Sequence, residues 1–79
     1  MTGYTLSTDE TVITTILRDA ACYSPEAYMS PKDLIAKCLE HGLKQEHAIE
    51  EALISLIDND IIDYEMDNDN QVSQLWLID

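Results

Sequence analysis

The spacing of hydrophobic residues changes along the chain, and each change marks a predicted element. Apolar positions recur every three or four residues over 8–23, 31–41 and 44–58, which is the spacing of helices that bury one side. Over 61–78 the spacing becomes two, with a polar turn at 68–71, which predicts a β-hairpin. The pattern predicts one α+β domain over residues 1–79, with three helices and a C-terminal antiparallel sheet of two or three strands.

The residues at the helix boundaries support these elements. Ser7 and Glu10 have the spacing of a capping box at the start of the first helix. Ser30 and Pro31 mark the start of the second helix, because serine caps helices and proline suits the first helical position. Gly42 is expected in the left-handed conformation that ends a helix, which leaves a sharp turn before the third helix.

The same spacing predicts which side of each helix is buried. Cys22 falls on the outward side of the first helix, and Ile54 points outward from the third although its neighbour Leu53 is buried. The expected core positions are Val12, Ile13, Ile16, Leu17, Ala20 and Tyr23 in the first helix, Leu34, Ile35, Cys38 and Leu39 in the second, and Ala48, Ile49, Ala52, Leu53, Leu56 and Ile57 in the third.

The last strand is apolar on both of its faces. Leu75 and Leu77 alternate with Trp76 and Ile78, so the two pairs point to opposite sides of the sheet. We expect Trp76 and Ile78 to be covered by the first helix, by an extended arm of residues 1–6, or by another chain.

The run DLIAKCLEHGLKQEHAIEEALISLIDNDIIDYE, followed by a turn and a returning strand, resembles the winged-helix superfamily. The resemblance covers the last two thirds of the chain, and residues 8–23 correspond to the family's first helix. It implies a wing and a short strand at Tyr28 and Met29 that pairs with the hairpin. Members bind DNA, RNA or proteins, so the fold alone does not select a function. The family's DNA-reading helix corresponds to residues 45–58, whose outward side here departs from the family's basic pattern.

Charge makes nucleic acid an unfavourable ligand. Sixteen Asp and Glu against four Lys and Arg give 79 residues a formal net charge of −12. Affinity for DNA depends on cations that displace counterions at phosphates, and the only ones are Arg18, Lys32, Lys37 and Lys44. No apolar run approaches the length of a membrane span, and two cysteines fit a reducing compartment, so we expect a cytoplasmic protein, in the host cell if it is viral.

Catalytic, cofactor and metal sites are not predicted. Cys22, Cys38, His41 and His47 have ligand chemistry but are not expected to converge, because Cys38 points into the core and Cys22 lies on another helix. The acidic field disfavours a reactive Cys22 thiolate. No nucleotide-binding motif is present. We therefore expect a protein that is not an enzyme and needs no cofactor.

The outward side of the third helix and the hairpin turn are the predicted partner-binding site. A DNA reader would present cations on both, whereas here both are acidic, with Ile54 at the centre of the helix side. The alternative interpretation is an acidic surface that serves solubility only. The predicted site residues are His47, Glu50, Glu51, Ile54, Asp58, Asp67 and Asp69.

These observations favour an acidic winged-helix protein that binds another protein with a basic surface. By analogy of size and charge we expect an inhibitor or adaptor of a nucleic-acid-handling protein, of the virus-encoded DNA-mimic or anti-defence type. Two alternatives stay open. One is a dimeric transcription regulator that binds DNA through Lys32, Lys37 and Lys44, and the other is an assembly subunit of a complex.

Overall fold

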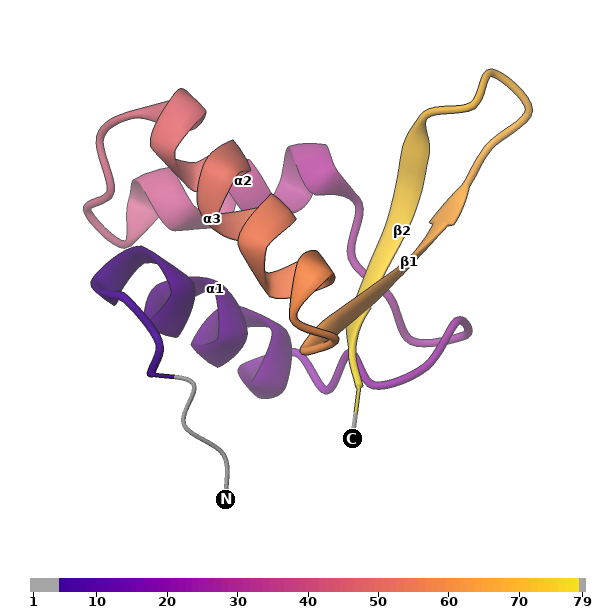
Figure 1. The fold of residues 1–79 in the computed structure, drawn as a ribbon, viewed down its shortest axis with the longest axis horizontal. Coiled ribbons are helices and arrows are strands. Elements are labelled where there is room, and N and C mark those ends of the chain that lie inside the picture. Colours follow the sequence, from indigo (N-terminus) through magenta and orange to yellow (C-terminus); the bar gives the residue numbers. More distant parts are fainter. Residues whose placement is uncertain (1–4, 79) are drawn as a thin grey trace.

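The computed structural model describes residues 5–78, which form three helices followed by a β-hairpin (Figure 1). The elements are α1 (Thr8–Asp19), α2 (Pro31–Glu40), α3 (Glu46–Asp58), β1 (Ile62–Met66) and β2 (Val72–Leu77). The strands pair antiparallel in one two-stranded sheet. This is the predicted α+β architecture, and its topology is winged-helix-like. Residues 1–4 of the expected N-terminal arm lie outside the described residues.

The helix starts are made by the predicted caps. The Ser7 hydroxyl accepts a hydrogen bond from the Glu10 amide at 3.2 Å, and the Ser7 amide donates to the Glu10 carboxylate at 2.8 Å. The Ser30 hydroxyl accepts from the Asp33 amide at 3.1 Å. Gln45, in contrast, makes no side-chain cap, and α3 begins at Glu46 instead of residue 44. Local hydrogen bonds therefore fix the first two helix starts.

All three helices end in the same backbone motif, in which the residue after the cap has a positive φ. That residue is Ala21 with φ 57°, Gly42 with φ 99° and Asp60 with φ 61°. The next amide then donates back to the helix, as from Cys22 to the Leu17 carbonyl at 2.9 Å. Gly42 confirms the prediction, but α1 ends at Asp19 and not at residue 23.

The early end of α1 changes the surroundings of the residues that follow it. Ala20 and Tyr23 are exposed, against the prediction that they are buried. Cys22 is buried, against the prediction that it points outward, because the chain turns back over the core after Ala21. The Cys22 carbonyl accepts a hydrogen bond from the Leu77 amide at 2.8 Å, which ties this turn to the last strand.

The core lies where the three helices meet the base of the hairpin. Most predicted core positions of α1 and α3 are buried or half-buried. On α2, Leu34 and Cys38 are fully buried, whereas Ile35 is half-buried and Leu39 is 41% exposed. The largest fully buried side chains are Ile13, Leu17, Leu34, Ile49, Leu56, Ile62 and Leu75.

The hairpin is buried at its base and exposed toward its turn. Ile62 pairs with Leu77, and a bulge follows Glu65, where Met66 pairs with Val72. The predicted third strand is reduced to Met29, which exchanges two hydrogen bonds of 2.9 Å with Leu75. Tyr28 is not part of this bridge.

Trp76 and Ile78 do not share the environment predicted for them. Trp76 is buried within the chain and belongs to the hydrophobic core, so it needs no second chain to cover it. Ile78, beyond the end of β2, is 46% exposed. Within residues 5–78, no helix is long and apolar enough to span a bilayer.

Candidate partner-binding surface

The five predicted site residues on α3 share its outward side. His47, Glu50, Glu51, Ile54 and Asp58 are all exposed, whereas Ile49, Leu53 and Leu56 on the opposite side are buried. The adjacent pair fixes the rotation of the helix, because Leu53 is 8% exposed and Ile54 is 58% exposed. α3 therefore presents one apolar side chain surrounded by acidic residues and a histidine.

Two members of this set interact with each other. His47 Nε2 lies 3.2 Å from a Glu51 carboxylate oxygen, one helical turn away, and both side chains are largely exposed to solvent. Such an exposed pair contributes little to stability because water screens it. Glu50 is not part of this contact.

The other two predicted residues, Asp67 and Asp69, lie in the hairpin turn and make different hydrogen bonds. The Asp67 carboxylate accepts hydrogen bonds from the amides of Asp69 at 2.8 Å and Gln71 at 3.1 Å. This arrangement supports the left-handed conformation of Asn70, whose φ is 62°. Asp67 therefore shapes the turn, which the sequence pattern did not reveal, whereas the exposed Asp69 contributes its backbone amide.

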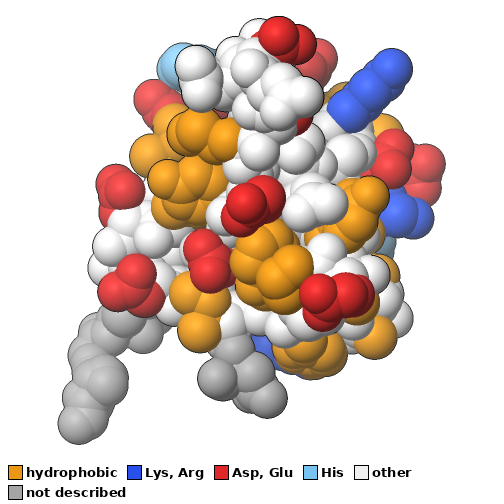
Figure 2. Space-filling model, turned by 90° about the vertical axis from the view of Figure 1, so that its right-hand side faces the viewer, with side chains coloured by type: hydrophobic (Ala, Val, Ile, Leu, Met, Phe, Trp, Pro, Cys, Tyr) orange, Lys and Arg blue, Asp and Glu red, His pale blue; other side chains and the backbone are white. Residues whose placement is uncertain are grey.

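The helix residues and the turn residues lie on two separate arms. In Figure 1 the hairpin leaves the C-terminal end of α3 and diverges from it, so that its turn forms a corner of the molecule. Figure 2 shows acidic side chains spread over the side of the molecule that carries the hairpin, with groups of hydrophobic side chains between them. We call the seven predicted residues the α3–hairpin surface, and they lie on two elements that diverge from each other and not on one helix.

The charge of the chain is divided unevenly. Residues 45–79 contain ten Asp and Glu but no Lys or Arg, so all four cations lie before α3. α3 carries four acids, and β1 with the turn carries four more. A winged helix that used α3 and the wing to approach phosphates would meet repulsion at both places.

The cysteines are placed as structural residues. Burial raises the pKa of the Cys22 thiol, and burial together with the Asp9 carboxylate raises the pKa of the Cys38 thiol to about 11. Both thiols are therefore protonated near neutral pH, and the thiol form is a poor nucleophile and metal ligand. Within residues 5–78, no three His, Cys, Asp or Glu side chains are grouped in a way that would hold a metal ion.

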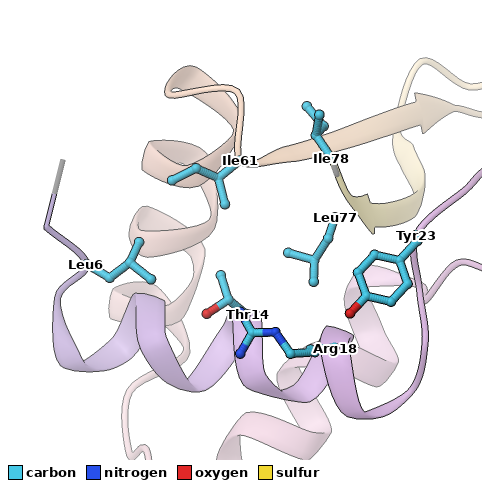
Figure 3. Close-up of a pocket in the computed structure, with 7 residues that line it drawn as sticks. All are labelled: Leu6, Thr14, Arg18, Tyr23, Ile61, Leu77 and Ile78. Atoms are coloured by element: carbon cyan, nitrogen blue, oxygen red, sulfur yellow. The ribbon is translucent and has the colours of Figure 1, made fainter. Parts of the chain in front are cut away.

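A cavity of about 370 Å³ lies on another part of the molecule, between α1 and the end of β2. Figure 3 shows Leu6, Ile61, Leu77 and Ile78 around it, with Thr14 and Arg18 on α1 and Tyr23 on the segment that follows α1. It contains none of the seven residues of the α3–hairpin surface. The sequence pattern did not predict this cavity, because its lining residues come from segments that are far apart in the sequence.

No protein-family model matches the chain, and no curated protein or solved structure was found to match it. Fold and surface chemistry are therefore the observations from which a function can be argued.

Proposed function

We propose that this protein binds another protein through the α3–hairpin surface, and that the partner presents a basic surface there. The observation that carries the proposal is the charge reversal of a winged-helix-like domain: residues 45–79 hold ten acids and no Lys or Arg. In such a domain α3 and the wing are the elements that meet DNA, which requires cations. A surface with the opposite charge favours a cationic protein over a polyanion.

Ile54 supports a specific contact. It is 58% exposed at the centre of the acidic side of α3, although Leu53 beside it is buried. In protein interfaces, charges steer the encounter, and apolar side chains that lose water at the centre slow dissociation. The acids of the α3–hairpin surface would set the association rate, and Ile54 would set the dissociation rate.

We infer further that the partner is a basic protein that handles nucleic acid, which this protein inhibits or to which it serves as an adaptor. A small domain whose acids occupy two arms offers such a protein a negative surface in place of a nucleic acid. The assignment to the winged-helix superfamily and to the DNA-mimic or anti-defence type belongs to this proposal, and it is supported by topology and charge.

Titration with duplex DNA separates this function from that of a transcription regulator. We expect no binding at low ionic strength, where electrostatic attraction to phosphates would be greatest. Micromolar affinity that weakens steeply as salt is raised would contradict the proposal. The slope of log affinity against log salt concentration reports the number of phosphates that cations neutralise. A variant with Glu50→Lys and Glu51→Lys, which restores cations to α3, serves as the control that is expected to gain affinity.

A further inference from the structure

The outward side of α2 carries apolar side chains that are partly open to solvent. Lys32, Ile35, Ala36 and Leu39 follow the helical spacing of one face, and Glu46 at the start of α3 lies beside them. Together these five residues line an open cavity of about 370 Å³, which we call the α2 groove. Leu39 is 41% exposed there, although the hydrophobic pattern predicted it for the core, and Ile35 is half-buried and packs against the core.

The helix that carries the groove differs in net charge from the other two helices. α2 contains two Lys, one Asp and one Glu, so it is the one helix of the three without net charge. In the same terms, α1 has three acids and one Arg, and α3 has four acids and no Lys or Arg. Two copies that each carry a charge of −12 would therefore meet less repulsion at α2 than at α1 or α3.

The groove also carries one charge of each sign. Lys32 and Glu46 both line it, and they form no ion pair with each other. In a dimer with twofold symmetry both copies contribute the same surface. If residue i of one copy contacts residue j of the other, then residue j of the first copy contacts residue i of the second. A groove with an apolar middle, one cation and one anion is self-complementary under this symmetry, with Lys32 of each copy facing Glu46 of its partner.

We propose that the α2 groove is the contact between two copies of this chain. The dimer buries Ile35 and Leu39 of each copy and forms two Lys32–Glu46 pairs across the twofold axis. None of the seven residues of the α3–hairpin surface lines the groove, so each copy keeps that surface for another partner. Because the apolar area is small and the net charges repel, the dimer is weak and becomes tighter as salt screens the repulsion.

Sedimentation equilibrium over a range of protein concentrations tests the proposal. At about 0.5 M sodium chloride we expect a monomer–dimer equilibrium that shifts toward monomer when salt is lowered. A protein that stays monomeric up to about 500 µM at this salt concentration overturns the proposal.

Matched substitutions locate the contact. Leu39→Lys places a charge in the groove while it lowers the net negative charge, so general repulsion cannot explain a loss of dimer; we expect the dissociation constant to rise at least about tenfold. Ile54→Lys makes the same change of charge on the outward side of α3 and is expected to leave the dimer intact. The reverse result, with Ile54→Lys as the disruptive change, overturns the proposal and assigns self-association to α3. Thermal unfolding of both variants shows that they are folded.

A charge swap tests the symmetry. Lys32→Glu and Glu46→Lys are each expected to weaken the dimer, because each creates like-charged pairs, whereas the double variant restores both pairs. The two single variants mixed together are expected to form a heterodimer in preference to either homodimer. Failure of both rescue experiments overturns the pairing. Partner binding by Leu39→Lys is measured in parallel, and because that variant leaves α3 unchanged, failure of the dimer and failure of the proposed function remain distinguishable.

Discussion

The outward sides of α2 and α3 are both exposed helix surfaces with an apolar centre, but their charges differ. α2 presents Ile35, Ala36 and Leu39 on a helix without net charge. α3 presents Ile54 on a helix with four acids and no Lys or Arg. The exposed apolar residues of the two helices are therefore expected to bind different partners, since the surrounding charges decide which molecules can approach. We propose that on α2 these charges allow a second copy of the chain to bind, and that on α3 they favour a cationic protein instead.

The exposure of Ile54 depends on the rotation of α3, which one pair of substitutions can test. Leu53→Ala removes a buried side chain and is expected to lower the free energy of unfolding by about 2–5 kcal/mol. Ile54→Ala removes an exposed one and is expected to change it by less than about 0.5 kcal/mol. Chemical denaturation of both variants measures the difference. Equal losses would show that Ile54 is buried and that the outward side of α3 is not free for a partner.

The inner side of α2 can be examined through the Cys38 thiol. Its folded-state pKa of about 11 lies above the ordinary value of 9.0, so folding favours the protonated form. This contribution is complete below pH 9 and is lost as pH rises from 9 toward 11, because the unfolded chain ionises first. The loss amounts to at most roughly 3 kcal/mol. Between pH 8 and pH 10.5 the free energy of unfolding is expected to decline less steeply for Cys38→Ala than for the wild-type chain. If the two proteins show parallel curves of this free energy against pH, the burial of the thiol is contradicted.

Substitution of the two acids on the hairpin turn tests which of them shapes the turn and which is free to contact a partner. Asp67→Ala removes an acceptor of two backbone hydrogen bonds and is expected to lower the free energy of unfolding by about 1 kcal/mol. Asp69→Ala removes an exposed carboxylate of the same charge and is expected to have almost no effect on stability. If the two variants unfold alike, Asp67 is not required for the turn, and both acids are available for binding.

The smallest expected effect is that of salt on stability. Sixteen acids in one small domain repel each other, and about 0.15 M salt screens charges beyond about 8 Å. Moderate sodium chloride is expected to stabilise the fold by on the order of 0.5 kcal/mol, a rise in melting temperature of roughly 2–4 °C. The effect is expected to be smaller in the variant with Glu50→Lys and Glu51→Lys. A melting temperature that falls with salt would show that attractive pairs dominate.

Much of the fold could be predicted from the sequence because its signals are local. The caps at Ser7 and Ser30 and the turn at Gly42 depend on residues a few positions apart. The end of α1 gave no such signal, because Ala21 takes a conformation that usually belongs to glycine. The burial of Trp76 depends on contacts between distant segments, which periodicity does not describe.

The candidate surface, like the fold, was only partly predictable from the sequence. The outward side of α3 followed from helical spacing, which fixes how Leu53 and Ile54 differ. The role of Asp67 in the turn depends on exact backbone geometry, and the divergence of the hairpin from α3 depends on tertiary packing. The α2 groove was not predicted, because spacing alone places Leu39 toward the core and only the packed structure shows that it is exposed.

The central claim is that position, and not only net charge, makes the α3–hairpin surface a binding site. The direct test begins with capture of a partner from the native host by the wild-type chain and its identification by mass spectrometry. The control for charge is a variant with Asp19→Lys and Glu26→Lys, which are exposed acids outside α3 and the hairpin. It has the same net charge as the variant with Glu50→Lys and Glu51→Lys.

The decisive measurement is the association rate of the purified partner with these two variants. We predict that reversal of Glu50 and Glu51 slows association at least about tenfold, whereas reversal of Asp19 and Glu26 changes it much less. Equal slowing by both variants would show that only net charge matters and would contradict the proposed site.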